Sequence, residues 1–561
     1  MTVPTLRSSL RRATPRTLTL AASIAWRHVT GEPVRAVLLA WRVLPRPVRG
    51  AVVLARPYGR AAVLWGSGDR AAAVAALDRS PRRQAAFALA VDRPQAARAA
   101  LARLPVPDPY LSAQLAWREG RLEDAVRAAG AATRPARRVR RLRAALAAQG
   151  HLGTAGELGT PVTAASAFTH GGGGRVLHIV TDALPSTSAG YTIRTHEIVR
   201  AQRAAGLDPH VVTAAGFPVT QGVLDGRRLV TLDGVPYHRV LPWTIGRDPG
   251  LDTLTARLGP DILHAASNYK NARTALALRD RHGIPVVYEV RGFWEDTWLS
   301  RHRVNEGADE DALRASELYQ RIRAEETACM LAADLVVTLG EAMRGEIVSR
   351  GVAPDKVTVV PNAVSEEFLQ PLVPAGHDGF TVGTVTTLNP HEGLATLLDA
   401  VGLLTARGIP ARALIVGDGP ELLPLRRHAE RSGVPATFTG RVPAAKVREY
   451  HALLDVFVVP RTRDRVCQLV TPLKPVEAMA SGLCVVTSEV SALAEIVKHE
   501  VTGALTVPQD PVSLADCLEW LFYSPDIRAK FGAAAREWVA ADRTWKANAA
   551  RYVQAYERLK G

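Results

Sequence analysis

Cysteine and long apolar runs are both scarce in this chain of 561 residues. The four cysteines, Cys329, Cys467, Cys484 and Cys517, stand far apart or in core-like strands and show no metal-ligand spacing, so they indicate a reducing compartment. No run approaches the roughly 18 apolar residues of a membrane-spanning helix. The amino terminus has arginines but no continuous apolar segment with a small-residue cleavage site, so we do not expect export.

Lysine is absent from residues 1–170, although this region is strongly basic. It holds 27 arginines and nine acidic residues, a net charge of +18, whereas residues 171–561 carry a net charge of −2. A basic region beside a nearly neutral body predicts an anionic partner surface, either membrane or nucleic acid. A compositional bias towards arginine, shared with the alanine richness, is the alternative explanation.

Residues 1–60 form a basic amphipathic arm in which Trp26 and Trp41 stand among arginines and short apolar clusters. Three prolines between residues 33 and 47 limit it to short helices. Arginine and tryptophan on short amphipathic helices are typical of interfacial membrane segments. An arm packed over the next domain is the alternative. Nucleic-acid binding is less favoured, because aromatic side chains do not recur at regular spacing.

Residues 61–157 show an alanine-rich helical pattern with a weak repeat. The segments LWGSGDR at 64–70 and AWREGRL at 116–122 each precede an alanine-rich run. Glycine at a helix end followed by such a run predicts stacked helical hairpins resembling tetratricopeptide repeats, which usually bind a partner or brace a neighbour. Residues 158–174 are rich in small residues and end in four glycines, which predicts a flexible linker.

The stretch 455–489 reads as a strand, a basic loop, a proline-started helix and a second strand, a unit of a parallel α/β sheet. Pro472 and Pro475 suit the first turn of a helix, so we expect the helix to begin at one of them. Its amino end would face a basic loop at the carboxyl edge of the sheet and make an anion site there. The cations are Arg461, Arg463, Arg465 and Lys474. A solvated basic loop, with Glu477 paired to a neighbouring arginine, is the alternative.

Within this stretch, PRTRDRVCQLVTPLKPVEAMASGLCVVTSEVSALAEIV at 460–497 resembles the donor-binding segment of retaining glycosyltransferases of family 4, which have the GT-B fold. The resemblance implies that Lys474 and Arg461 hold the donor diphosphate and that the carboxylate of Glu477 holds the nucleotide ribose. It implies further that backbone around the helix start supports the sugar. This backbone belongs to Thr471, Pro472 and Leu473.

The sequence departs from the family pattern at Leu469. Many family members carry a glutamate at this position, and it contacts the transferred sugar. Either Gln468 or backbone groups replace that contact, or turnover is impaired.

A second resemblance lies after the strand RVLHIVT at 175–181, in the loop SAGYTIR at 188–194. A glycine between a strand and a helix lets a ligand approach the backbone closely. In the family such a loop faces the donor phosphates. The resemblance gives this role to Gly190, with Tyr191 and Arg194 beside it.

Two further strands end in segments that resemble those lining the family's cleft. One carries His264 and the other, YEVRGFWED at 288–296, carries Arg291. The resemblance places both in the cleft, and Arg291 stands where other branches carry a histidine near the sugar. A cation such as Arg291 could hold the leaving diphosphate or an acidic acceptor, whereas His264 could equally be a strand-end residue with satisfied hydrogen bonds. The acidic run at 309–311 follows no apolar strand and is interpreted as a solvated helix end, and we expect no metal.

The carboxyl-terminal half contains two more segments that resemble donor-binding parts of the family. Gly417 and Gly419 form a turn after an apolar strand, and Arg441 and Val442 follow a strand whose end packs on the nucleobase in the family. Many relatives carry a diphosphate-binding Arg and Lys where this chain has Thr386 and Thr387 and the run His-Glu-Gly at 391–393. Their absence here strengthens the assignment of phosphate binding to the two donor-loop cations.

These observations predict an α/β protein of the GT-B fold, with two Rossmann-like domains facing a cleft and an all-α, tetratricopeptide-like extension before them. The expected parts are an arm at 1–60, a helical-repeat domain at 61–157, a linker at 158–174, an acceptor domain at 175–375, a donor domain at 376–541, and a helix at 542–561 that returns to the acceptor domain.

The predicted function is that of a retaining glycosyltransferase. It would move a sugar from a nucleotide diphosphate-sugar to a lipid-linked or polysaccharide acceptor in cell-envelope or exopolysaccharide synthesis, without a cofactor. The expected location is the cytoplasm, at the inner face of the plasma membrane, with a protein partner on the helical repeats as a further possibility. A catalytically silent scaffold at the membrane is the alternative.

Overall fold

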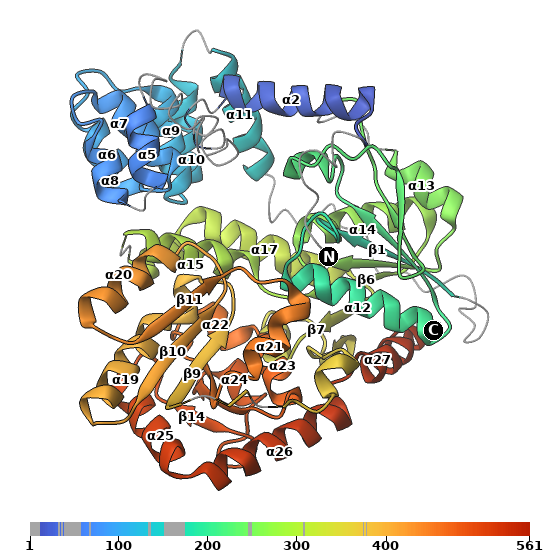
Figure 1. Ribbon diagram of the computed structural model, residues 1–561. Coiled ribbons are helices and arrows are strands. Elements are labelled where there is room, and N and C mark those ends of the chain that lie inside the picture. Colours follow the sequence, from blue (N-terminus) through green and yellow to red (C-terminus); the bar gives the residue numbers. More distant parts are fainter. Residues whose placement is uncertain are drawn as a thin grey trace.

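The computed structural model contains two β-sheets flanked by helices and a separate group of helices near the amino terminus (Figure 1). It describes residues 12–31, 34, 38, 58–66, 69–132, 136–150, 174–244, 250–306, 309–373, 375–376 and 378–560. All but the last residue of the predicted linker 158–174 lie outside the described residues. The same is true of most of 32–57, including Trp41.

The first sheet has eight strands in the order β3-β4-β2-β1-β5-β6-β7-β8, and its pairs are parallel except β3 with β4. Its central strands are buried at nearly every position, because helices cover both faces. The strands are β1 (Arg175–Val180), β2 (Asp208–Thr213), β3 (Leu229–Leu232), β4 (Val235–His238), β5 (Ile262–Ala266), β6 (Val286–Val290), β7 (Leu335–Thr338) and β8 (Val357–Val359). The helices are α12 (Gly190–Ala204), α13 (Leu251–Leu258), α14 (Tyr269–His282), α15 (Trp294–Glu306), α16 (Glu310–Ala315), α17 (Glu317–Ala332) and α18 (Glu341–Ser349).

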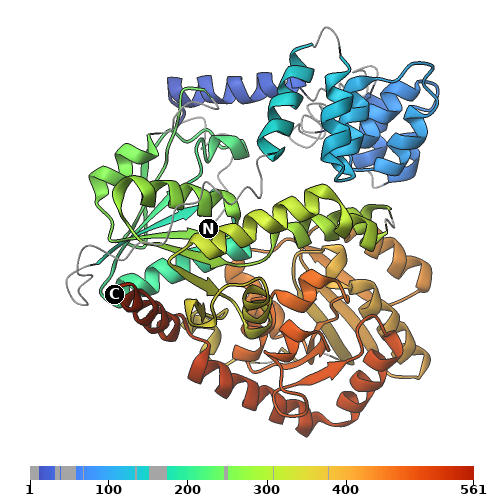
Figure 2. The same ribbon diagram turned by 180° about the vertical axis from the view of Figure 1, so that it is seen from behind.

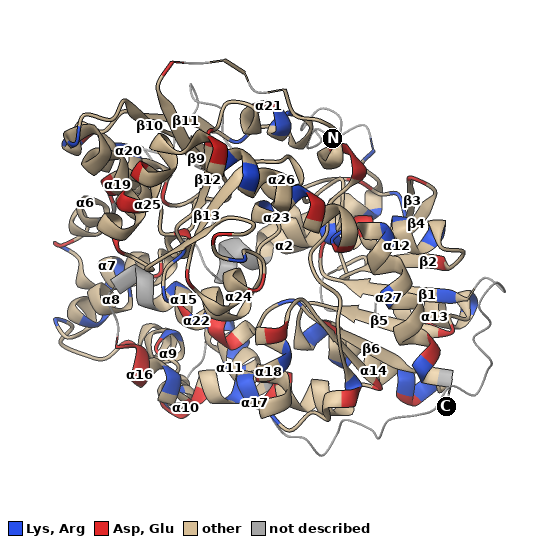
Figure 3. Cartoon of the chain, turned by 90° about the horizontal axis from the view of Figure 1, so that it is seen from below, with Lys and Arg blue, Asp and Glu red and all other residues tan. Residues whose placement is uncertain are grey.

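The second sheet is parallel, with six strands in the order β11-β10-β9-β12-β13-β14. Charged residues of both signs lie mainly on the surrounding helices, and the strands are largely uncharged (Figure 3). The strands are β9 (Phe380–Val385), β10 (Ala411–Val416), β11 (Ala436–Gly440), β12 (Val456–Val459), β13 (Cys484–Ser488) and β14 (Ala504–Thr506). The helices are α19 (Leu394–Ala406), α20 (Leu422–Ser432), α21 (Val447–His451), α22 (Arg465–Leu469), α23 (Lys474–Ala480), α24 (Ser491–Ala494), α25 (Pro511–Tyr523) and α26 (Pro525–Asp542).

The last helix, α27 (Trp545–Glu557), leaves the second domain and packs against α12 of the first. Tyr552 and Tyr556 are fully buried there, in one apolar cluster with Val176 and Ile198. The two Rossmann-like domains are therefore joined twice along the chain. One connection follows β8, and the other is the passage from α26 to α27 (Figure 2).

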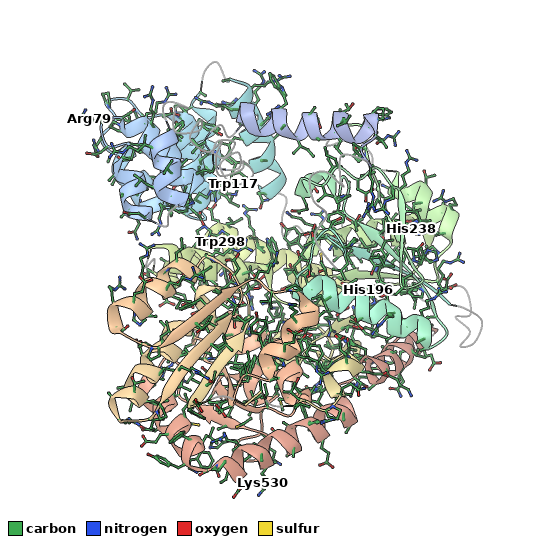
Figure 4. All side chains as sticks on the ribbon, in the orientation of Figure 1. Arg79, Trp117, His196, His238, Trp298 and Lys530 are labelled. Carbon is green, nitrogen blue, oxygen red and sulfur yellow. The ribbon has the colours of Figure 1, made fainter. Side chains whose placement is uncertain are left out.

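The helices of the amino-terminal region form hairpins, in which α7 packs with α8 and α9 packs with α10. The turn after α9 meets the first domain, where the backbone N–H of Leu318 donates to the carbonyl of Gly120 at 2.9 Å. Gly120 has φ +79°, and a side chain there would collide with Ser316. Trp117 and Trp298 lie on facing sides of this junction (Figure 4). The helices are α5 (Gly59–Gly66), α6 (Arg70–Ala75), α7 (Pro81–Ala90), α8 (Pro94–Leu101), α9 (Pro109–Arg118), α10 (Leu122–Gly130) and α11 (Arg137–Gly150).

Helix α2 (Pro15–Gly31), from the predicted arm, packs on the first domain. Leu20 is fully buried with Val219 and Leu241 of that domain, and Arg16 lies 4.7 Å from the ring centre of Trp243. Over α2 the structure thus agrees with the alternative of a packed arm. Leu18 and Trp26 on the same helix are 50% and 58% exposed. None of the described helices is long and apolar enough to cross a bilayer.

Candidate functional site

The connection from β12 to α23 forms the donor loop, residues 460–473, at the carboxyl edge of the second sheet. Helix α23 begins at Lys474 with Pro475 in its first turn, so of the two prolines the second marks the helix start. The loop is less open than the sequence indicates. Helix α22 occupies part of it, because backbone N–H groups of Cys467 and Gln468 donate to the carbonyl of Asp464.

Lys474 and Glu477 face each other at the amino end of α23. The Lys474 ammonium donates to the Glu477 carboxylate at 2.9 Å, one turn along the helix. The lysine side chain is 31% exposed and the glutamate side chain 9% exposed. The partner of Glu477 is thus a lysine rather than the neighbouring arginine considered above. A cation and a carboxylate lie together at a helix amino terminus, where an anion is favoured.

Arg461 is buried, and its side-chain N–H groups donate to acceptors within the second domain. It pairs with Glu392 at 3.0 Å and donates to the carbonyl of Val470 at 2.9 Å. Burial alone would raise the pKa of Glu392, but the Arg461 charge and hydrogen bonds lower it to about 2. Arg461 therefore braces the donor loop, and Lys474 is the more exposed cation of the pair that the family resemblance assigns to diphosphate.

The expected convergence of four cations is wrong, because Arg465 points away to the first domain. Its guanidinium lies 2.5 Å from Glu346 of α18 and 3.4 Å from Asp296 of α15. Arg463 is exposed. A second contact crosses the domain boundary nearby, where the Glu495 carboxylate accepts the backbone N–H groups of Glu341 and Ala342 at the start of α18. Charge contacts thus hold the two domains together beside the donor loop.

Gly190 begins α12 in the first domain, and a side chain built there would meet nothing within 4 Å. Tyr191 follows it, 43% exposed, with its hydroxyl donating to Asp182 at 3.0 Å. Arg441, exposed after β11, donates from the second domain to the carbonyl of Ser188 at 3.4 Å. The glycine loop therefore lies opposite the end of β11, with open space at the helix start.

His264 is completely buried, which corrects its predicted catalytic role. Its ring is hydrogen bonded to the Tyr556 hydroxyl at 2.7 Å and to Glu289 at 2.9 Å, and it stacks on His178. Burial lowers the pKa of His264, although Glu289 opposes the shift, so the imidazole is neutral. The structure agrees with the alternative of a histidine with satisfied hydrogen bonds, but His264 lies in the middle of β5 and not at its end, where Tyr552 and Tyr556 of α27 cover it.

Arg194 and Arg291 are corrected in the same way, since both are paired with the buried carboxylate of Glu289. Arg194 Nε lies 2.9 Å from Glu289 Oε1, and Arg291 makes contacts of 3.0 and 3.1 Å to the two oxygens. The two guanidinium groups hold the pKa of Glu289 well below its usual range despite its burial. Arg291 also donates to the Tyr191 carbonyl at 3.0 Å. These arginines support the start of α12 instead of facing a substrate.

The buried network continues into the donor loop through Asn362. Arg194 donates to Asn362 Oδ1 at 3.2 Å, and Asn362 Nδ2 donates to the carbonyl of Thr471 at 2.8 Å. A chain of hydrogen bonds therefore joins the glycine loop to the donor loop through the interior. Sequence reasoning missed Glu289 and Asn362 as site-forming residues. Glu289 lies in the motif YEVR and Asn362 in the motif PNAV, and these positions were the sequence signal that could have identified them.

Gly417 and Gly419 serve close packing between two loops. A side chain at Gly417, where φ is +143°, would strike the carbonyl oxygen of Thr386, and one at Gly419 would strike that of Leu388. Val442 is partly buried against the apolar cluster of the second domain. These contacts account for both glycines without a ligand.

The departure at Leu469 also has a structural reason. Leu469 is buried in a cluster with Leu339 and Met343 of the first domain, so it belongs to the domain interface. The side-chain oxygen of Gln468 accepts from the backbone N–H and the hydroxyl of Ser491, at 3.0 and 3.1 Å. Gln468 is therefore engaged with α24.

Two family models match the chain, and together they span residues 189–538, more than half of it. The model described as Glycosyltransferase Family 4 matches residues 189–368, and the model described as Glycosyl transferases group 1 matches residues 367–538. The boundary between the two falls in the connection that follows β8.

Several curated proteins are similar in sequence. A GDP-mannose-dependent α-(1-6)-phosphatidylinositol monomannoside mannosyltransferase of Mycobacterium tuberculosis is 35% identical over 175 residues, 30% of this chain and 46% of that protein. The chain thus spans less than half the length of this relative. A GDP-mannose-dependent α-mannosyltransferase of Mycolicibacterium smegmatis is 27% identical over 69% of this chain and 98% of that protein. A sulfoquinovosyl transferase of Arabidopsis thaliana is 25% identical over 62% and 67%.

Solved structures share the fold of the two-domain body. Sucrose-phosphate synthase from Thermosynechococcus elongatus superposes with a TM-score of 0.54 at 19% identity, covering 69% of this chain and 99% of that one. HepE of Anabaena, solved in complex with UDP, gives a TM-score of 0.51 at 17% identity, covering 68% and 100%. The part of this chain that they cover corresponds in size to the two Rossmann-like domains.

Proposed function

The chain belongs to the family 4 glycosyltransferases of the GT-B fold, and from this premise we propose that it moves a glycosyl group from a nucleotide diphosphate-sugar to a lipid-linked or polysaccharide acceptor. The observation that carries the proposal is the pair of Lys474 and Glu477 at the amino end of α23. The lysine would bind the diphosphate and the glutamate the ribose, so donor binding would replace their mutual contact.

Transfer breaks the bond between the anomeric carbon and the diphosphate oxygen and forms a bond to an acceptor oxygen. The acceptor proton would pass to the leaving diphosphate, and departure and attack on one face of the sugar would retain the anomeric configuration. Negative charge grows on the diphosphate during the step. Lys474 and the α23 amino terminus would therefore lower the barrier more than they tighten ground-state binding.

A lipid-linked acceptor is supported by two observations. A relative is named for its action on a phosphatidylinositol monomannoside, and α2 presents the exposed side chains of Leu18 and Trp26 on the first domain, with Trp243 nearby. Tryptophan and leucine beside arginine suit the lipid–water interface. The enzyme would then act as a peripheral protein at the inner face of the plasma membrane.

A silent scaffold is the second candidate, and the burial of Leu469 in the domain interface favours it. The retained pair of Lys474 and Glu477 favours an enzyme. The two functions differ in turnover. A scaffold could bind nucleoside diphosphates but would not hydrolyse or transfer the sugar.

The test compares Lys474→Ala with Lys530→Ala, an exposed lysine on α26 far from the donor loop (Figure 4). Calorimetry with UDP and GDP measures donor binding, and release of the free nucleotide from UDP- and GDP-sugars measures turnover. We expect Lys474→Ala to lower kcat about 10²-fold to 10³-fold, the usual effect of removing one donor to a developing oxyanion. Lys530→Ala should match the wild type. Equal turnover in both variants would contradict the proposed site, and binding without turnover in the wild type would favour the scaffold.

A further inference from the structure

The amino-terminal helical region contains a cavity of about 290 Å³ that is separate from the GT-B body. It lies among α7, α9 and α11 and is lined by residues from each of them, together with Val34 and Tyr58. This volume lies near the lower end for ligand sites in proteins, so it would hold a few side chains and not a folded partner.

Positive charge dominates the wall of this cavity. Its described lining residues include four arginines but one carboxylate, that of Asp108. Asp108 pairs with Arg82 at 2.7 Å and caps α9 with its other oxygen, and Arg118 pairs with Asp92 at 3.1 Å. Both carboxylates are therefore already paired, and they neutralise Arg82 and Arg118.

Arg83 and Arg138 are the two lining arginines left in excess. Among the described residues Arg83 has no carboxylate partner, and Arg138 lies 4.8 Å from the ring centre of Tyr110. Several arginines on or just after the neighbouring helices α8 and α10 do have partners. Arg98 pairs with Glu119, Arg103 with Asp78, and Arg127 with Asp124. Other arginines of the region, such as Arg60 and Arg79, also have no carboxylate partner among the described residues, so the cavity differs from its surroundings in that two such arginines face one recess.

Aromatic and apolar side chains complete the cavity. Burial raises the pKa of the Tyr58 hydroxyl, while the charges of Arg83, Arg82 and Arg138 oppose the rise, so all three guanidinium groups act on this phenol. Leu89 and Leu111 are buried in the lining. A ligand here would meet cations, hydroxyl groups and an apolar floor together.

We propose that this cavity binds a short acidic peptide segment of a partner protein. Its carboxylates would pair with Arg83 and Arg138, and an adjacent apolar side chain would contact Leu89 and Leu111. A peptide fits better than a bilayer, because the cations line a recess between helices and not a flat face. It fits better than nucleic acid, because two cations in one small cavity do not provide the track of phosphate contacts that a backbone needs.

The position of the cavity gives such binding a consequence for the enzyme. The same helical region is fixed to α17 of the first domain by the contact between Gly120 and Leu318, and the Glu123 backbone N–H donates to Glu317 at 2.8 Å. A captured partner would be held at a set place beside the GT-B body. The inference does not depend on the proposed catalytic site.

The test measures binding of fluorescein-labelled hexaglutamate to the full chain by fluorescence anisotropy at low ionic strength. The double variant Arg83→Glu/Arg138→Glu should weaken binding about tenfold or more, since it replaces both charge pairs with repulsion. Arg79→Glu is the matched control, because Arg79 is exposed at the outer end of the region and does not line the cavity (Figure 4). If the double variant melts at a lower temperature than the wild type, Arg83→Gln replaces it in the binding measurement, because Arg83 is at an exposed position.

Three results would overturn the proposal. Wild-type protein that does not bind the peptide is the first. Equal weakening by Arg79→Glu is the second, since it would mean that only the net charge matters. The third is displacement of the peptide by phosphatidylserine vesicles but not phosphatidylcholine vesicles, with loss of vesicle binding in Arg83→Glu/Arg138→Glu. That result would assign the cavity to a lipid headgroup.

Discussion

The two faces of the cleft use their motif residues in opposite ways. In the first domain, His264, Arg194 and Arg291 converge on the buried carboxylate of Glu289 and are withdrawn from solvent. In the second domain, the Lys474 side chain remains partly exposed beside Glu477 at a helix start. A motif can therefore mark a site in two ways. The first domain fixes the position of the glycine loop, and the second supplies the groups that would meet the donor.

Removing the centre of the first-domain network should have the largest effect on stability. Glu289→Ala leaves two buried guanidinium groups without their shared carboxylate, which should lower the free energy of unfolding by about 3–5 kcal/mol. The control is Glu341→Ala, whose carboxylate is largely exposed and 3.5 Å from Arg344, with an expected change below about 0.5 kcal/mol. Denaturant titration gives both values. Similar losses of unfolding free energy in Glu289→Ala and Glu341→Ala would contradict a structural role for the buried network of the first domain.

Two buried glutamates allow the comparison to be sharpened by pH, because their pKa values move in opposite directions. Glu326 of the first domain has a pKa of about 8, since burial raises it, helped by Glu295. Glu392 of the second domain has a pKa of about 2, as Arg461 outweighs burial. The folded state should therefore lose stability as pH rises from about 4.5 to 8 through Glu326, and as pH falls from about 4.5 to 2 through Glu392.

Isosteric variants separate these two contributions. In wild-type protein the free energy of unfolding should fall by up to about 1.4 kcal/mol per pH unit on the alkaline side, and Glu326→Gln should remove this fall and stabilise the protein at pH 8. Glu392→Gln should destabilise the protein at the same pH. The midpoint of denaturant unfolding measured across this pH range reports both effects. A loss of stability in both variants at pH 8 would show that Glu326 is ionised in the folded protein.

The smallest effect is expected at the contact between the domains. Arg465→Ala removes the cation that Glu346 and Asp296 share, which should loosen closure and weaken nucleoside diphosphate binding several-fold, about 1 kcal/mol. Arg463→Ala is the matched control on the same loop, because Arg463 is exposed and has no carboxylate partner among the described residues. Calorimetry with the preferred diphosphate compares them. Equal affinity in both variants would rule out a role for Arg465 in closure.

Local patterns were sufficient for the fold and for the position of the donor loop. Continuous apolar runs such as VFVV at 456–459 indicated buried parallel strands, and Pro472 and Pro475 indicated the start of α23 to within a few residues, because both preferences act over short distances. The burial of His264 could not be predicted in this way. Its cover comes from Tyr552 and Tyr556, almost 300 residues later in the chain.

The sequence by itself determined which segments become strands, helix starts and turns, since these follow from side-chain size, backbone freedom and short-range periodicity. Only the tertiary structure decided which charged side chains meet. Arg461 reaches Glu392, Arg465 crosses to Glu346, and Arg194 turns inward to Glu289 because remote elements bring their carboxylates within reach. Electrostatic pairing depends on distance in space, and separation along the chain does not encode it.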